Sequence, residues 1–272
     1  MKVNTVTLEG KKDGEIELPN IFETEIKKDV IRKAYINLES HGFQKHSTHA
    51  TAGQDVVADS NDPPTGRGIS RIARMKGGGG GRQGQAGEVA STRGGRQAHP
   101  PKAEKVIYKK INKKENKLAL CSAISATKSK ELISQRGHKI EGINSFPLII
   151  SDEIETITQT SKMIKILEDL KLIQDVNRLE NRKKRSGKVA LRGRTKKTGK
   201  SALFVLSDSR NVKNACRSIP GVDACSVKDL SVLDLAPGSD LIRLTIYSKK
   251  AIEEISKIKS RHLELMVTLN WM

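Results

Sequence analysis

Residues 66–102, which read GRGISRIARMKGGGGGRQGQAGEVASTRGGRQAHPPK, constrain the fold of this chain more than any other stretch. They include eleven glycines and no Phe, Tyr or Trp, and their larger aliphatic side chains are only Ile69, Ile72, Met75 and Val89. Because so little apolar surface can be buried, the entropy lost on ordering this backbone is not offset, and the segment cannot build a core of its own. We therefore expect it to be mobile when no partner is bound.

The charge of the chain predicts that its partner is a polyanion. The formal net charge is +19 and the pI is about 9.9, which is typical of proteins that bind nucleic acid. Residues 66–102 hold eight Lys or Arg and one acid, Glu88, and residues 178–200 hold eleven Lys or Arg and one acid, Glu180. These two segments carry 17 of the 19 net charges and leave the other 212 residues close to neutral. The pattern indicates one globular body that bears two basic, nucleic-acid-binding segments.

Several classes of protein are disfavoured by the same sequence. No stretch reaches the roughly 18 apolar residues of a membrane helix, and the N-terminus MKVNTVTLEGKK lacks the apolar region of a signal peptide. We expect a cytoplasmic protein with no membrane contact. Cys121, Cys216 and Cys225 are odd in number and form no C-x-x-C motif, so we interpret them as small buried hydrophobic residues.

The hydrophobic pattern predicts a hairpin and a helix before the first basic segment. Alternation over residues 3–8 and 15–18 indicates the hairpin. Apolar residues at three- and four-residue intervals indicate a helix over residues 24–40, with Thr24 as its N-cap and Gly42 as its stop signal. Periodicity then fails as far as residue 105. At about 3.3 Å per residue, a hairpin-like loop of this length could reach on the order of 100 Å.

From residue 106 onward, helical and strand patterns alternate. Asn112 is placed as the N-cap of a capping box, and Gly137 as the end of a second helix. We predict helices at 118–126, 127–135, 163–173, 212–217 and 252–258, and strands at 147–151, 203–206, 222–227 and 241–247. Such alternation is typical of an α/β fold with a mainly parallel sheet flanked by helices. The long basic loop would be inserted into that fold.

These patterns divide the chain into four parts. Residues 1–42 and 106–259 form one globular domain, residues 43–105 an extended RNA-threading loop, and residues 178–200 a basic RNA-binding loop within the domain. Residues 260–272 are a tail in which apolar residues alternate with a period of two, as in a strand. The tail either packs on the core or docks by edge addition on a neighbouring protein or RNA.

Motifs for small-molecule sites are incomplete. Gly193, Gly199, Lys200 and Ser201 resemble a phosphate-binding loop, but five residues separate the glycines instead of four, and the loop precedes a strand instead of opening a helix. The spacing of His46 and His49 suggests a metal, yet no Cys or carboxylate cluster completes the set, so we favour contacts with RNA phosphates. We predict no cofactor, no metal and no enzymatic activity.

The two basic segments also lack aromatic residues. Proteins that read single-stranded RNA on RRM or OB folds need aromatic platforms for the bases. We therefore expect contacts with phosphates, 2′-hydroxyls and RNA shape.

Five stretches of the chain resemble a known family. They are TGRGISRIAR with the glycine run after it, GGRQAHPPK, ALCSAISATKSKELISQRGH with PLIIS after it, RGRTKKTGKSALFVLSD, and LDLAPGSDLIRLTIYSKKAIEEIS. In the same order, they resemble the archaeal and eukaryotic form of large-subunit ribosomal protein L-four. The resemblance covers residues 1–258, and GGRQAHPPK is among its most specific parts. The tail RHLELMVTLNWM departs from the family pattern.

The resemblance implies a structural constituent of the large ribosomal subunit. Such a protein binds the 5′ region of the large-subunit ribosomal RNA early in assembly, next to other ribosomal proteins. Its long loop forms part of the wall of the polypeptide exit tunnel and lies near the nascent polypeptide. The tunnel-proximal loop tip would comprise Ile69, Arg71, Arg74, Gly77, Gly78, Gly79, Gly80 and Gly81. Ribosomal RNA contacts are assigned to Arg67, Arg71, Arg74, Lys76, Arg82, Arg93, Arg96, His99, Lys102, Arg182, Lys183, Lys184, Arg185, Lys188, Arg192, Arg194, Lys196, Lys197 and Lys200.

Two rival functions remain open at this point. One is a free regulator or chromatin-like protein that binds duplex nucleic acid without sequence preference. The other is a nucleotide-dependent RNA-modifying enzyme, which the defective phosphate-loop spacing disfavours. Sedimentation with large ribosomal subunits separates the structural function from both.

Overall fold

The computed structural model describes residues 2–56, 58–60, 64–77, 81–143, 145–180, 182–195, 197, 199–240 and 242–258. The chain divides into two compact units, one formed by residues 1–40 with residues 109–272 and the other by residues 41–108. The strand predicted in the 260–272 tail lies outside the described residues. None of the described helices is long and apolar enough to cross a membrane.

The first unit contains a six-stranded sheet that is parallel except at one edge. The order is β2-β1-β5-β8-β6-β7, and only the hairpin of β1 and β2 is antiparallel. The strands are β1 (Lys2–Val6), β2 (Lys12–Glu17), β5 (Leu148–Ile150), β6 (Leu203–Leu206), β7 (Asp223–Ser226) and β8 (Thr245–Ser248). The predicted α/β class with a mainly parallel sheet is confirmed.

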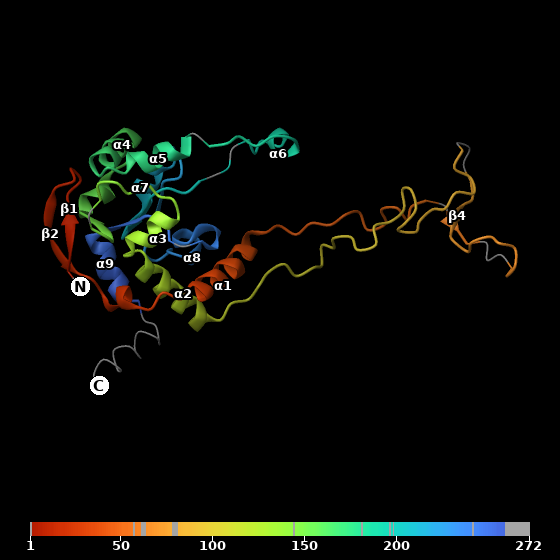
Figure 1. Ribbon diagram of the computed structural model, residues 1–272, viewed down its shortest axis with the longest axis horizontal. Helices are drawn as coiled ribbons and strands as arrows, with labels where there is room; N and C mark the ends of the chain where they lie inside the picture. Colours follow the sequence, from red (N-terminus) through yellow and green to blue (C-terminus); the bar gives the residue numbers. More distant parts are fainter. Residues whose placement is uncertain are drawn as a thin grey trace. The chain divides into compact units, whose positions relative to one another are not determined.

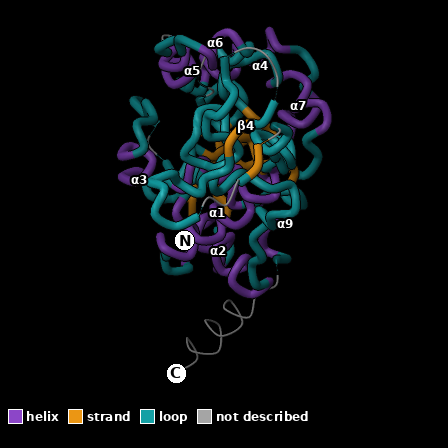
Figure 2. The backbone as a smooth tube through the Cα atoms, turned by 90° about the vertical axis from the view of Figure 1, so that its right-hand side faces the viewer, coloured by secondary structure: helices purple, strands orange, loops and turns teal. Residues whose placement is uncertain are grey.

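Helices cover both faces of this sheet. They are α1 (Lys28–Glu39), α2 (Lys113–Ala126), α3 (Lys130–Gln135), α4 (Thr160–Asp169), α5 (Ile173–Glu180), α6 (Lys188–Leu191), α7 (Arg210–Cys216), α8 (Val232–Leu235) and α9 (Lys249–Ser256). Figure 1 shows α4, α5 and α7 on one side of the strands and α1, α2 and α8 on the other. In the turned view of Figure 2, helices surround the strands of this unit.

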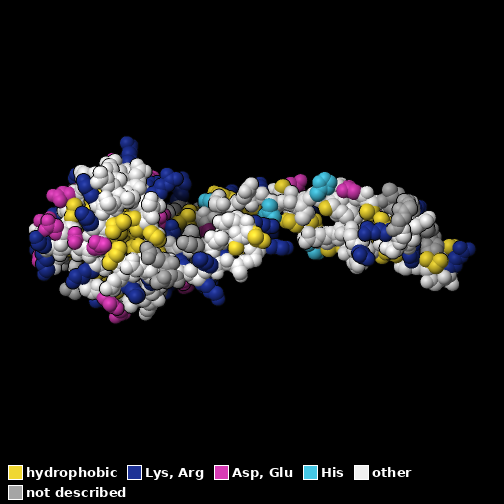
Figure 3. Space-filling model, turned by 90° about the horizontal axis from the view of Figure 1, so that it is seen from above, with side chains coloured by type: hydrophobic (Ala, Val, Ile, Leu, Met, Phe, Trp, Pro, Cys, Tyr) yellow, Lys and Arg dark blue, Asp and Glu magenta, His cyan; other side chains and the backbone are white. Residues whose placement is uncertain are grey.

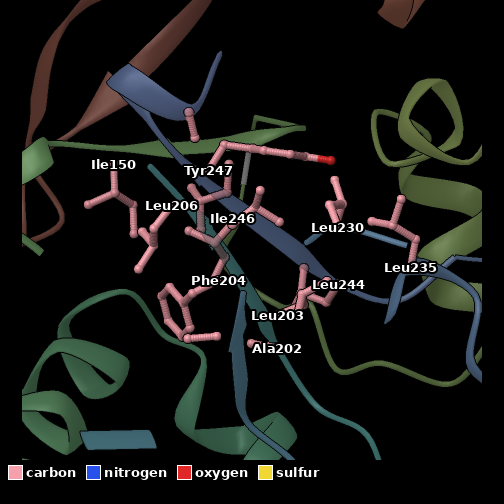
Figure 4. Close-up of a cluster of buried hydrophobic side chains, with 14 of the residues drawn as sticks. Ile150, Ala202, Leu203, Phe204, Leu206, Leu230, Leu235, Leu244, Ile246 and Tyr247 are labelled. Atoms are coloured by element: carbon pink, nitrogen blue, oxygen red, sulfur yellow. The ribbon is translucent and has the colours of Figure 1, made fainter. Parts of the chain in front are cut away.

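The core lies between the central strands and these helices. All residues of β5, β6 and β8 are buried, which explains why their sequences LII, LFVL and TIYS do not alternate with charged residues. Figure 4 shows side chains of these strands packed together, among them Phe204, Ile246 and Tyr247. The Tyr247 ring meets that of Phe22 edge-on, with centroids 5.8 Å apart. Each such buried side chain stabilises the fold by about 1.5–3 kcal/mol.

The prediction that Thr24 caps the first long helix is wrong. Residues Asn20–Glu23 form a 3-10 turn that Thr24 closes with an extended backbone, and α1 begins four residues later. Hydroxyl groups on α2 hold this stretch in place, because Ser122 donates to the carbonyl of Glu25 over 2.7 Å and Ser125 to that of Thr24 over 2.5 Å. These partners are about 100 residues away, so local periodicity could not reveal them. Gly42 likewise ends a 3-10 turn, Ser40–Gly42, instead of the helix.

The apolar stripe predicted as one helix over 163–173 belongs to two helices. Met163, Leu167 and Leu170 are buried as predicted. The helix nevertheless ends at Asp169, and Lys171 takes a left-handed backbone conformation before α5 begins. The hydrophobic pattern did not predict α5 as a separate helix.

Two further differences concern caps and strand ends. Asn112 is the N-cap residue of α2, but its side chain makes no capping hydrogen bond, whereas Ser231 forms an unpredicted capping box with Asp234 at α8. The strand predicted from residue 241 begins only at Thr245. Just before it, the Arg243 N–H donates to the carbonyl of Leu235 over 2.8 Å.

The second unit, residues 41–108, is held by backbone hydrogen bonds and not by a core. Where periodicity predicted no element, β3 (Ala58–Asp59) and β4 (Arg74–Met75) form a short antiparallel pair. Gly53 has a positive φ, and a Cβ there would overlap the backbone of Gly95 and Arg96, so the two limbs approach as only glycine permits. No described residue of this unit belongs to the hydrophobic core, which agrees with the small number of large apolar side chains in residues 66–102.

Candidate nucleic-acid interface

The two ends of the basic segment of the first unit, residues 178–200, lie next to one buried carboxylate, that of Asp175. Asp175 lies in the first turn of α5, before the segment, and Ser201 follows it. The hydroxyl of Ser201 donates to Asp175 Oδ2 over 2.6 Å, and Nδ1 of His138 lies 2.9 Å from the same oxygen. Oδ1 accepts from the Lys139 N–H and from Nε of Arg178, both at 3.0 Å. The carboxylate therefore has four partners.

The protonation of this carboxylate follows from those partners. Burial alone would raise the pKa of Asp175, but the hydrogen bonds from His138 and Ser201 outweigh it and lower the pKa to about 2. Asp175 is therefore ionised at neutral pH. Its negative charge is stabilised by hydrogen bonds from His138, Lys139, Arg178 and Ser201.

Ser201, His138 and Asp175 do not form a catalytic triad. In a triad the serine donates to the imidazole and the carboxylate orients that imidazole. Here both the serine and the histidine contact the carboxylate, and His138 Nε2 accepts from the Leu244 N–H at 3.4 Å. The three residues hold structure together, as expected from a sequence without a recognisable catalytic set.

A buried arginine fixes the strands next to this cluster. The side chain of Arg243 is 1% exposed and donates to the carbonyls of Ser201, Ala202 and Gly221. It also pairs with Asp223 at 2.7 Å, and Asp223 pairs with Lys200 at the same distance. Burial opposes ionisation of Asp223, yet Lys200 and Arg243 together lower its pKa. This end of the basic segment is thus anchored to the sheet.

Residues 182–200, which we call the basic arm, fold as two limbs joined by α6. The Arg185 N–H donates to the carbonyl of Thr195 over 2.7 Å, and Nη1 of Arg182 donates to that of Lys197 over 3.1 Å. The guanidinium of Arg182 lies against Gly199, where any Cβ would overlap it. Arg182 therefore braces the arm as well as adding charge.

Most of the predicted RNA-binding side chains are exposed. In the basic arm, Arg182 and Arg185 are half-buried, and in the second unit Arg74 is half-buried. Figure 3 shows Lys and Arg side chains recurring along the visible face of the second unit. The other predicted bases that the structure describes are exposed: Arg67, Arg71, Lys76, Arg82, Arg93, Arg96, His99, Lys102, Lys183, Lys184, Lys188, Arg192, Arg194, Lys197 and Lys200. Lys196 and Gly78, Gly79 and Gly80 of the predicted tip lie outside the described residues.

Few of these bases are neutralised within the protein. Among the predicted RNA-binding bases that the structure describes, only Lys76 and Lys200 pair with a carboxylate. Lys76 pairs with Asp59 and Lys200 with Asp223, in each case at 2.7 Å. Arg71 and Arg74 instead donate to neutral oxygens, those of Thr65 and of the Gly84 backbone. The positive charge of both segments is therefore available to an external anion.

The structure adds bases that the sequence analysis did not single out. Lys213 and Arg217 line a pocket together with Lys200, at the base of the arm. Their spacing of four residues at α7 was the signal that could have revealed them, since it places both side chains on one face. In the second unit, Arg96 and Lys102 line a pocket with His49.

Two histidines of the second unit, His41 and His49, have separate partners. His49 Nδ1 lies 3.1 Å from the Thr51 hydroxyl, and the His41 ring stacks on Tyr108. Across the described residues, no three His, Cys, Asp or Glu side chains gather as a metal site would require. Cys121 and Cys216 are buried and Cys225 is half-buried, so the prediction of small buried residues is confirmed for the first two.

The sequence of the chain is similar to those of known proteins. A profile of the Ribosomal protein L4/L1 family matches residues 16–258. The protein described as large ribosomal subunit protein uL4 from Methanosphaera stadtmanae is 40% identical over 94% of this chain and 97% of its own length. Proteins of the same description from Methanococcus maripaludis and Archaeoglobus fulgidus are 39% and 38% identical, each over 94% of this chain and 99% of its own length.

Proposed function

The chain belongs to the ribosomal protein L4/L1 family, and on that premise we propose that it is a structural, RNA-binding constituent of the large ribosomal subunit. Its relatives are large-subunit proteins, and the protein is not an enzyme. Its principal partners are large-subunit ribosomal RNA and neighbouring ribosomal proteins.

The observation that carries this proposal is the unneutralised charge of the two basic segments. The basic arm holds ten Lys or Arg in nineteen residues and therefore repels itself. The only carboxylate paired with a described base between residues 182 and 200 is Asp223, at the very end of the arm. Ribosomal RNA would supply the missing negative charge, and release of its counterions would drive binding.

The two basic segments have different supports, and we assign them different tasks. The arm is fixed at its base by Asp175 and Arg243, so it serves as an anchor on the 5′ region of the RNA early in assembly. The described residues of the second unit form no apolar core of their own and are held by backbone bonds. This unit would thread between RNA helices as an extended loop, with residues 69–81 at the exit tunnel next to the nascent polypeptide.

A binding experiment with the full-length protein tests the function. Affinity for a transcript of the 5′ region of large-subunit ribosomal RNA is measured by filter binding between 50 and 400 mM KCl, with an unrelated transcript of equal length as control. We expect the logarithm of the affinity to fall linearly with the logarithm of the salt concentration, and the cognate transcript to bind more tightly at every salt. Equal affinity for both RNAs, or for duplex DNA, would favour the rival of a nonspecific nucleic-acid binder.

Sedimentation of a cell lysate gives an independent test. The protein should migrate with large ribosomal subunits and leave them only at high salt. A protein that stayed in the soluble fraction or with DNA would contradict the proposal.

A further inference from the structure

The two ends of the second unit meet in a pair of stacked rings. His41 is its first residue and Tyr108 its last. Their ring centroids lie 4.3 Å apart, and the ring planes are inclined by 19°. The residues that precede His41 and follow Tyr108 in the chain are also bonded to each other, because the Lys109 N–H donates to the Ser40 hydroxyl over 2.9 Å and that hydroxyl donates to the carbonyl of Asn37.

Apolar side chains next to this pair are exposed. Phe43 is 57% exposed, Tyr108 52% and Val106 77%, whereas Ile107 between the last two is half-buried. The chain has four Phe and three Tyr, all of them described, and only Phe43 and Tyr108 are exposed. We call His41, Phe43, Val106 and Tyr108 the neck face.

The charge around the neck face identifies the class of its ligand. Residues 102–114 contain six lysines, at positions 102, 105, 109, 110, 113 and 114, and one acid, Glu104. Lys105 and Lys110, on either side of Val106 and Tyr108, are exposed. An exposed aromatic between lysines suits an unpaired nucleotide, because the base stacks on the ring and the ammonium groups donate hydrogen bonds to the phosphates.

We infer that the neck face is a stacking site for an unpaired base of the ribosomal RNA, which stacks on the exposed ring of Tyr108. Lys105 contacts a flanking phosphate. This inference rests on the proposed function and adds a stacking contact that the two aromatic-free basic segments lack. Since every base has a π face, the site tolerates any sequence and fixes where the chain enters the RNA.

The test uses the full-length protein and the 5′-region transcript with two variants of one residue. Tyr108→Leu keeps apolar bulk and removes the ring, whereas Tyr108→Phe keeps the ring and removes only the hydroxyl. We expect Tyr108→Leu to bind about tenfold more weakly at every salt concentration, with an unchanged salt slope, because stacking releases no counterions. Tyr108→Phe should bind like the parent. Tyr108 is exposed, so circular dichroism of both variants should match the parent.

A charge variant and a cross-link separate stacking from electrostatics. Lys105→Gln should lower the salt slope by about one, since it removes one phosphate contact. Ultraviolet irradiation of the complex should attach a nucleotide to the peptide that contains Tyr108.

The possible outcomes distinguish a failure of this inference from a failure of the proposed function on which it rests. If the parent protein shows no salt-dependent preference for the transcript, the proposed function fails. If the parent binds and Tyr108→Leu binds equally well, the stacking site is wrong and the function stands. If Tyr108→Leu binds naked RNA normally but fails to join subunits assembled with other ribosomal proteins, the neck face docks a protein and the inference is overturned.

Discussion

The hydroxyl of Ser201 donates to the carboxylate of Asp175 over 2.6 Å, and the basic arm lies between these two residues in the sequence. This bond ties the end of the arm to the helix at its start. Because the arm repels itself, its limbs would separate without such a tie. The buried cluster around Asp175 thus holds the two ends of the arm in a fixed position.

Replacing Asp175 with Asn should destabilise the protein markedly. The substitution removes the charge that His138, Ser201 and Arg178 share, and leaves buried donors without a full acceptor. We expect a loss of about 2–4 kcal/mol in the free energy of unfolding, measured by urea denaturation. Ser201→Ala removes one of the four hydrogen bonds and should lose only about 1 kcal/mol. Equal losses for both variants would contradict the central place of Asp175.

The same carboxylate should make stability depend on pH in the acid range. The pKa of Asp175 is lowered to about 2 from its ordinary value of 3.8. The unfolded chain therefore binds this proton first as pH falls, so the stabilisation is complete above about pH 5 and is lost as pH falls through 2. The difference in unfolding free energy between the parent and Asp175→Asn should shrink by about 2 kcal/mol between pH 5 and pH 2. A difference that stayed constant would show that Asp175 is not the titrating group.

Strands with continuous apolar sequence could be predicted closely. β6 occupies Leu203–Leu206 as predicted, because a buried parallel strand carries its own signal in LFVL. Helix termini were harder, since the extended backbone at Thr24 depends on hydroxyl groups of α2 about 100 residues away. Local patterns carry no trace of such long-range bonds.

Only the charge of the candidate interface could be predicted from the sequence. Runs of Lys and Arg located both basic segments, but Asp175 lies 37 residues from His138 and 26 from Ser201, and no spacing rule connects them. The stacking of His41 on Tyr108 could not be predicted, because the two rings are 67 residues apart in the sequence and both lie outside the two basic segments.

Charge reversal in the arm should weaken RNA binding without unfolding the protein. Lys183 and Lys184 are exposed, whereas Arg182 and Arg185 brace the arm, so Lys183→Glu with Lys184→Glu is the cleaner change. Each lost phosphate contact should lower the salt slope by about 0.9. The matched control is Lys162→Glu with Lys165→Glu on the exposed face of α4. An equal effect of both pairs would indicate that only total charge matters.

The second unit should be the first part of the isolated protein to be cleaved by trypsin. None of its described residues belongs to the hydrophobic core, so its opening costs little free energy. We expect early cuts between residues 43 and 101, with fragments of the first unit surviving, as mass spectrometry would show. Addition of the cognate RNA should slow these cuts. Strong protection of residues 67–96 without RNA would refute the expectation.

Removal of Lys76 to Gly81 should alter the exit tunnel and spare incorporation into the subunit. The Gly84 N–H donates to the carbonyl of Met75 over 2.9 Å, so the deletion joins Met75 to Arg82 and leaves these two partners three residues apart, as in a β-turn. The pairing of β3 with β4 can therefore persist. Because the first unit and the basic arm supply the anchoring charge, reconstituted subunits should contain the variant at parental levels. The lost bulk and positive potential should instead change the stalling of particular nascent peptides, or sensitivity to inhibitors that bind the tunnel, by several-fold. Replacing the same six residues with Gly-Ser repeats of equal length restores bulk without charge and separates the two causes. If the deletion abolished incorporation in purified reconstitution, residues 76–81 would be an assembly element and not a tunnel element.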